Sequence, residues 1–203
     1  MDENERQRAF ISALTTEHLT LQTAASGTIT EAASRASLYV FSLSSSLVAM
    51  GFVSRSPATF WPFAAAILPA LFILGLFTIV RLIDTGIENQ QFLRRIARIR
   101  SYYATLTPEA ADLFAANSWS KKRFPPLWAG SLVAFLTTAA TMIAFINSVV
   151  AGTGVTLLAN TLLGGHKLGL AVGIGVTATA TLLAVFVGYQ RWRYRSAEPS
   201  SSE

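Results

Sequence analysis

The chain has 203 residues, of which 52% are hydrophobic and only 13% charged, and its net charge is +5. Because soluble domains usually carry about a quarter of charged residues, this composition favours a membrane protein. The absence of cysteine excludes disulfides, thiolate metal sites and cysteine nucleophiles. The basic residues gather at the edges of the apolar segments, which indicates anionic lipid as a partner and no nucleic acid.

Residues 1–35 are expected to form a cytoplasmic amphipathic helix that leads into the first membrane span. The positions on its apolar seam are Ile11, Leu14, His18, Leu21 and Ala25. Ser26 and Gly27 predict a break, after which Thr28 and Glu31 fit a capping box for a second helix. No apolar signal-like region precedes residue 36, so we expect this segment to be retained.

Glu31 and Arg35 lie four residues apart, with the glutamate first, which is the favourable order for an ion pair in a helix. This pair is expected to neutralise both charges at the membrane interface. Alternatively, Arg35 contacts lipid phosphate or a ligand when Glu31 releases it.

Residues 36–80 are predicted to form a first transmembrane hairpin. The stretches 36–54 and 58–80 carry no charge, and each is long enough to cross about 30 Å of hydrocarbon. The short turn 55–57 joins them, and Pro69 is expected to be a tolerated kink in the second span.

Residues 81–126 form the long polar passage of the chain and are predicted to be a cytoplasmic helical segment. At helical spacing, one face carries Phe92, Ile96, Ile99 and Tyr103, and the other carries Arg94, Arg95 and Arg98. The three arginines are interpreted as a solvated face, as a contact with anionic lipid, or as a binding site for a small phosphorylated ligand. Further on, Thr107 and Pro108 predict the start of a short helix.

Residues 127–190 are predicted to form a second transmembrane hairpin, with spans at 127–150 and 168–190. The glycine-rich stretch 151–154 is expected to break the third span and to begin an apolar loop. Residues 191–203 are expected to be a disordered cytoplasmic tail.

The distribution of lysine and arginine predicts the orientation. Of the sixteen basic residues, all but Arg55 and Lys167 fall on the side of the two termini and the central segment. The positive-inside rule therefore predicts a plasma-membrane protein that crosses the bilayer four times, with both termini in the cytoplasm. The predicted fold class is thus all-α, with two hairpins and a cytoplasmic helical segment between them.

Small and hydroxylated residues recur at helical spacing within the spans, which lets helices approach closely. One such face carries Ser42, Ser45, Ser46 and Ala49, and another carries Gly169, Gly173, Thr177 and Thr181. These faces are interpreted either as packing within one four-helix bundle, or as a homo-oligomer interface or hydroxyl-lined pore.

No pattern predicts an enzyme, a cofactor or a metal site. His18 and His166 fall on opposite sides of the predicted membrane, and no zinc-protease, serine-hydrolase or phosphate-loop motif occurs. The carboxylates of the predicted cytoplasmic segment are interpreted as helix-start residues, and they are Asp84, Glu88, Glu109 and Asp112. The spans carry no ionisable residue, which weakens a transporter without excluding a channel, and Asn147 is their most polar side chain.

Three stretches carry a resemblance. They are Glu31-Ala32-x-x-Arg35-Ala36-Ser37-Leu38-Tyr39, Leu68-Pro69 followed by Gly75-Leu76-x-Thr78-x-x-Arg81-Leu82, and Arg98-Ile99-Arg100-x-Tyr102-Tyr103. On them, over about residues 15–105, the chain resembles a group of uncharacterised actinobacterial-type multipass membrane proteins. Its architecture is more distantly similar to that of the bacterial transmembrane effectors of the SLATT and Pycsar type.

The second resemblance implies a homo-oligomeric membrane protein whose cytoplasmic part senses a signal and whose spans then impair the membrane. It assigns no residue, and the second hairpin departs from the hairpin-only pattern. The sequence therefore predicts a non-enzymatic membrane sensor or effector. The alternatives are a small channel or transporter subunit and a membrane scaffold.

Overall fold

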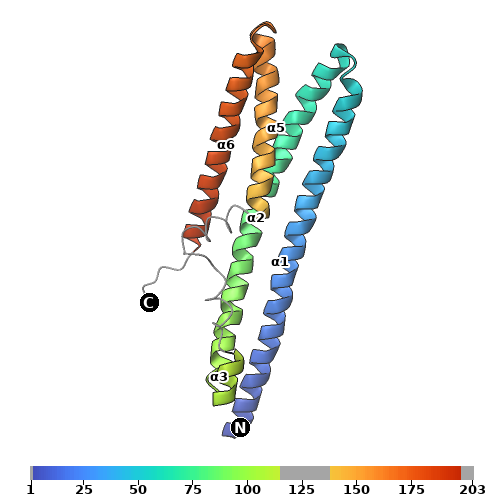
Figure 1. The fold of residues 1–203 in the computed structure, drawn as a ribbon. Helices are drawn as coiled ribbons and strands as arrows, with labels where there is room; N and C mark the ends of the chain where they lie inside the picture. Colours follow the sequence, from blue (N-terminus) through green and yellow to red (C-terminus); the bar gives the residue numbers. More distant parts are fainter. Residues whose placement is uncertain (1, 115–137, 198–203) are drawn as a thin grey trace. The chain divides into compact units, whose positions relative to one another are not determined.

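The computed structural model describes residues 2–114 and 138–197, and these residues form helices joined by short turns, with no strand among them. The helices are α1 (Glu3–Val53), α2 (Pro57–Tyr103), α3 (Pro108–Phe114), α5 (Ala139–Leu162) and α6 (Leu168–Ser196), as Figure 1 shows. In this described part, α1, α2, α5 and α6 are long and apolar enough to cross a membrane. Residues 2–114 and 138–197 are therefore all-helical and have the features of a multi-pass membrane protein.

Helix α1 is continuous, so the predicted break at Ser26 and Gly27 is wrong. A glycine inside a helix costs only about 1 kcal/mol relative to alanine, which neighbouring helical turns and packing can offset. The predicted cap at Thr28 is also wrong. Its hydroxyl donates to the backbone oxygen of Ala25 at 2.7 Å, as the hydroxyl of a threonine inside a helix commonly does.

Helix α2 joins the predicted second span and the predicted cytoplasmic helix in one element. It begins at Pro57, where the missing amide hydrogen would have no helical partner, and it contains Pro62 and Pro69. The helix ends at Tyr103, and α3 follows with the amide of Ala110 donating to the Thr107 hydroxyl at 3.1 Å. The predicted start of this short helix is confirmed.

Helix α5 corrects the prediction for the third span. It runs through the stretch 151–154, which was expected to be a break, and the chain turns instead at residues 163–167. Gly164 and Gly165 have φ angles of 70° and 78°, a conformation that favours glycine. Of the predicted span 127–150, residues 127–137 lie outside the described residues.

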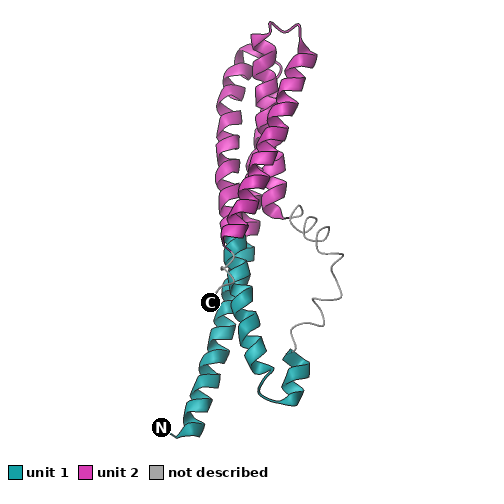
Figure 2. Ribbon diagram, turned by 90° about the vertical axis from the view of Figure 1, so that its left-hand side faces the viewer, with its two compact units in different colours: residues 1–31, 85–134 teal, residues 32–84, 135–203 magenta. Residues whose placement is uncertain are grey.

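The chain divides into two compact units, which Figure 2 distinguishes by colour. Unit 1 comprises Met1–Glu31 and Thr85–Ala134, and unit 2 comprises Ala32–Asp84 and Phe135–Glu203. Each helix of the pair α1 and α2 thus contributes residues to both units.

The core of unit 1 joins the two amphipathic faces that the sequence predicts. Leu21 of α1 packs with Ile96 and Ile99 of α2, and partly buried apolar side chains surround this cluster; they are Leu14, Phe92 and Tyr103. The two faces are therefore complementary, which confirms the helical periodicity of both segments.

Unit 2 brings together the apolar parts of α1 and α2 with α5 and α6. Its most deeply buried large side chains come from all four helices and include Tyr39, Ile83, Ile143 and Gln190. In Figure 1 the connection between α1 and α2 and the turn between α5 and α6 lie at the same end of this unit.

Candidate functional site

Unit 1 contains a groove of about 490 Å³ between residues of α1, α2 and α3. Helix α1 contributes Thr15, His18 and Gln22, and α2 contributes Arg100 and Tyr103. The other lining side chains are all apolar, and they are Ile11, Leu19, Leu106, Ala110 and Phe114. A groove of this size, largely apolar with a few polar groups, has the properties of a small-molecule site.

His18 is a half-buried polar residue of this groove. The Gln22 side-chain nitrogen lies 3.0 Å from His18 Nε2, and because this amide nitrogen can only donate, Nε2 accepts. The proton of a neutral ring is then assigned to Nδ1. Nδ1 is buried and has no hydrogen-bond partner among the described residues. A buried donor left unpaired costs about 1–3 kcal/mol, so an acceptor supplied here would be stabilising.

Aromatic rings form one wall of the groove. The ring centroid of Tyr103 lies 6.3 Å from that of His18 and 5.5 Å from that of Phe114, and both pairs are tilted. These separations are in the range of favourable aromatic contacts. The wall offers a flat apolar surface next to polar side chains.

Arg100 gives the groove its charge. It lines the groove from α2, and no aspartate or glutamate is among the lining residues. An arginine presents several N–H groups in a planar fork that matches carboxylate and phosphate. The groove is therefore suited to an anion.

The structure does not bring the predicted arginine face to this groove. Arg94, Arg95 and Arg98 are exposed, and none of the three lines the groove. Their contact with anionic lipid or a phosphorylated ligand stays a prediction. Sequence reasoning missed Arg100, although it stands one helical turn before Tyr103 on the apolar face, which is the spacing that could have identified it.

Glu31 and Arg35 lie one turn apart in α1, Glu31 half-buried and Arg35 exposed. Their pairing at the membrane interface stays a prediction.

Unit 2 has a buried polar centre at Asn147 of α5, whose side chain is fully buried. The Tyr39 hydroxyl of α1 donates to Asn147 Oδ1 at 3.2 Å, and Asn147 Nδ2 donates to the backbone oxygen of Phe72 in α2 at 3.3 Å. Gly75 provides the space, because a Cβ atom there would collide with the Asn147 amide. One side chain thus links three helices.

A second polar cluster joins α5 and α6. The Thr141 hydroxyl donates to Gln190 Oε1 at 3.1 Å, and Gln190 Nε2 donates to the Thr138 hydroxyl at 3.2 Å. Gln190 is 2% exposed, so its amide needs these partners.

Asp84 of α2 pairs with Arg193 of α6, with Arg193 Nη2 donating to Asp84 Oδ1 at 2.5 Å. This hydrogen bond and the negative charge of Asp84 raise the pKa of Arg193. The interpretation of Asp84 as a helix-start residue is wrong, because the residue lies inside α2 and bonds another helix. Sequence reasoning missed the pair because its partners are 109 residues apart.

The close approach of α5 and α6 uses glycines other than those predicted. A Cβ atom on Gly152 would lie 2.7 Å from the Gly175 carbonyl oxygen, and one on Gly175 would lie 2.6 Å from the Gly152 carbonyl oxygen. Gly169 and Gly173 are instead exposed and have open space around them. The predicted glycine face is therefore not the α5 contact, and its role between copies of the chain stays a prediction.

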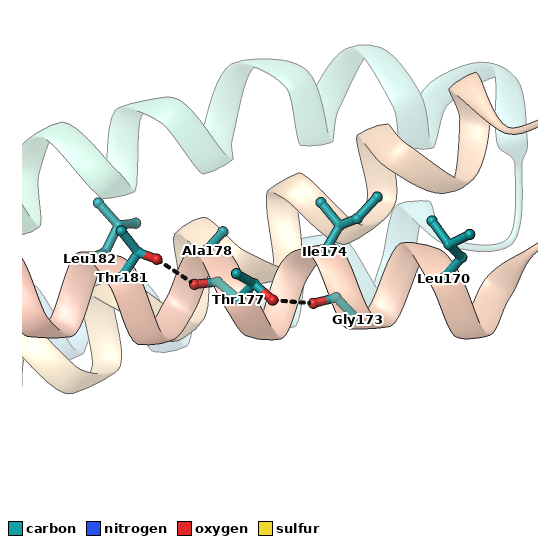
Figure 3. Close-up of a pocket in the computed structure, with 7 residues that line it drawn as sticks. All are labelled: Leu170, Gly173, Ile174, Thr177, Ala178, Thr181 and Leu182. Carbon is teal, nitrogen blue, oxygen red and sulfur yellow. Dashed lines mark hydrogen bonds between the residues drawn. The ribbon is translucent and has the colours of Figure 1, made fainter.

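Figure 3 shows the exposed face of α6 around Gly173. The Thr177 hydroxyl donates to the Gly173 carbonyl at 2.9 Å and the Thr181 hydroxyl donates to the Thr177 carbonyl at 2.8 Å, so both donors are used within the helix. On α1, Ser42 is half-buried and donates to the Leu38 carbonyl at 2.8 Å. Of its neighbours on that face, Ser45 is exposed and Ser46 is half-buried.

The part of the chain that the structure describes contains no group of three or more histidine, aspartate or glutamate side chains that could hold a metal ion. The groove of unit 1 and the polar centre of unit 2 remain as the candidate sites. No family model, no curated protein and no solved structure matches this chain.

Proposed function

We propose that this protein is a non-enzymatic multi-pass membrane sensor or effector, which responds to a cytoplasmic signal and acts as an oligomer. One observation carries the proposal: α1 and α2 supply most residues of the unit 1 groove. The same unbroken helices contain two of the four apolar segments of the described chain. A signal bound in the groove contacts the helices that respond to it.

The topology we propose has two hairpins, with unit 1 and both termini in the cytoplasm of a bacterial cell and the spans in the plasma membrane. The distribution of lysine and arginine supports it. The position of the two interhelical connections at one end of unit 2 also agrees with it.

The polar centre of unit 2 suits a protein that changes conformation. Hydrogen bonds between membrane helices contribute about 0.6 kcal/mol each on average and rarely more than about 1.7 kcal/mol. The bonds of Asn147 to Tyr39 and Phe72 therefore define one arrangement of α1, α2 and α5 without making it irreversible. A ligand with a few kcal/mol of differential affinity would be sufficient to shift it.

A small channel or transporter subunit is the main alternative, and the packing of unit 2 argues against a channel through a single copy. Tyr39, Ile83 and Ile143 are almost completely buried and fill the interior between the helices. A conducting path would then lie between copies of the chain, which agrees with an oligomeric effector.

Ion flux through liposomes that contain the purified full chain tests the proposal. We expect no flux in buffer, and flux after addition of the low-molecular-mass fraction of bacterial cytosol. Steady flux in buffer would support the channel alternative and overturn the sensor. No flux under either condition would also contradict the proposal and would favour a scaffold.

A further inference from the structure

We infer that the unit 1 groove binds a small water-soluble anion with an apolar body, that is, an aryl or short alkyl phosphate or carboxylate. This inference rests on the proposed function, because it names the chemical class of the signal. It differs from the sequence-based prediction in its residues, since it places the anion at Arg100 and His18 and not at the exposed arginines.

The charge of the groove selects an anion. Arg100 is a permanent cation among the lining residues, and no lining residue is acidic. The His18 Nδ1 proton is a second donor, which the described residues leave without an acceptor. A phosphate or carboxylate oxygen is a strong acceptor for both groups.

The remaining wall selects an apolar body. The rings of Tyr103 and Phe114 lie 5.5 Å apart, centroid to centroid, and Ile11 and Leu106 extend the apolar surface. A bare inorganic anion would leave this surface in water, whereas an aryl or alkyl group covers it. The volume of about 490 Å³ accommodates a ligand of this size.

The position of the groove in the chain favours a soluble ligand over a membrane lipid. Its lining residues fall within 11–22 and 100–114. The predicted first transmembrane hairpin covers residues 36–80 and so contains none of them. The ligand therefore reaches the groove from water.

Calorimetric titration of the full chain in nanodiscs of neutral lipid tests the inference. Phenyl phosphate is the probe, and inorganic phosphate and phenol are the partial probes that lack the ring or the charge. We expect phenyl phosphate to bind more tightly than either partial probe. Arg100→Gln should weaken its binding about tenfold to a hundredfold, the usual effect of losing a hydrogen bond to a charged group.

Arg94→Gln is the matched control, because it makes the same change at an exposed position of the same helix. We expect its effect on phenyl phosphate binding to stay within about twofold, as for a surface charge. Equal weakening by both substitutions would mean that only the overall charge matters, and would overturn the site. No binding of phenyl phosphate would overturn it as well.

Nanodiscs that contain phosphatidic acid distinguish a lipid from a soluble ligand, since this lipid carries the same phosphate chemistry. Unchanged phenyl phosphate binding in them supports a soluble ligand, and loss of binding by competition would overturn that assignment. Binding of the probe without any flux in response to cytosol would refute the sensor and leave the site standing. Flux that Arg100→Gln leaves unchanged, with no probe binding, would refute the site and leave the sensor standing.

Discussion

The Tyr39 hydroxyl donates to Asn147 Oδ1 at 3.2 Å, across 108 residues of sequence and between two different helices. Both side chains are fully buried. Because Asn147 also donates to the Phe72 carbonyl, this pair fixes the register of α1, α2 and α5. Its contribution to stability is measurable.

Asn147→Leu should lower the free energy of unfolding by about 1–3 kcal/mol, because the buried Tyr39 hydroxyl and the Phe72 carbonyl each lose a partner. Thermal unfolding in detergent, followed by tryptophan fluorescence, measures this loss. In the double variant with Tyr39→Phe, the loss should be smaller than the sum of the two single losses. Additive losses would show that the two side chains do not interact.

Gly75→Ala should destabilise unit 2 by about 1–3 kcal/mol, because the added methyl group overpacks the site against the Asn147 amide. Gly51→Ala is the control, since nothing lies within 4 Å of a Cβ atom there. Removing that helical glycine should stabilise the protein by up to about 1 kcal/mol. Similar unfolding temperatures for the two variants would contradict the close approach of Asn147 to α2.

Gly175→Ala should separate α5 from α6, because its methyl group would collide with Thr156 and with the Gly152 carbonyl. Gly173 lies on the exposed face of α6, and nothing lies within 4 Å of a Cβ atom there. Gly173→Ala should therefore leave the unfolding temperature of the monomer unchanged or raise it. Chemical cross-linking of both variants adds a second measurement. If the exposed face around Gly173 mediates oligomers, Gly173→Ala should reduce the cross-linked species, and an unchanged pattern would remove this face from the oligomer prediction.

Asp84→Arg and Arg193→Asp should each lower the unfolding temperature, since each places like charges next to one another. The double substitution exchanges the charges and should recover part of the loss. Arginine is protonated and aspartate is ionised throughout the neutral range, so this recovery should not depend on pH between about 6 and 8. A double variant as unstable as the worse single variant would show that the two residues do not pair.

Topology can be measured directly because the chain has no cysteine. Cysteines introduced at the exposed positions Ser56 and Ser101 should react with impermeant maleimide from opposite sides of the membrane. Labelling of both from the same side would contradict the proposed hairpins.

The sequence predicted what depends on periodicity. The apolar faces that meet at Leu21, Ile96 and Ile99 follow from helical spacing. The apolar segments follow from long runs of residues without charge. Breaks and caps were less predictable, since Gly27 and Gly152 both lie within helices. In a sequence, a glycine is compatible with a helix break and with a close contact between helices. The two cases are distinguished only by whether another helix packs against the glycine.

The polar contacts could not be predicted, because they depend on which distant residues meet. Asn147 was identified as the most polar side chain of the spans, but its partners Tyr39 and Phe72 come from helices far away in sequence. The same holds for Arg100, whose role depends on the position of α1 and α3 around it. Local pattern identifies the residue type, and tertiary structure identifies the site.

The core of unit 1 also imposes an order on synthesis. Leu21 leaves the ribosome long before Ile96 and Ile99, and the two apolar stretches 36–54 and 58–80 are made in between. The seam of the N-terminal helix therefore meets Ile96 and Ile99 only after both stretches have been made. Nascent chains arrested before residue 96 should expose this seam, and chaperones that bind apolar helices should protect it until α2 is complete.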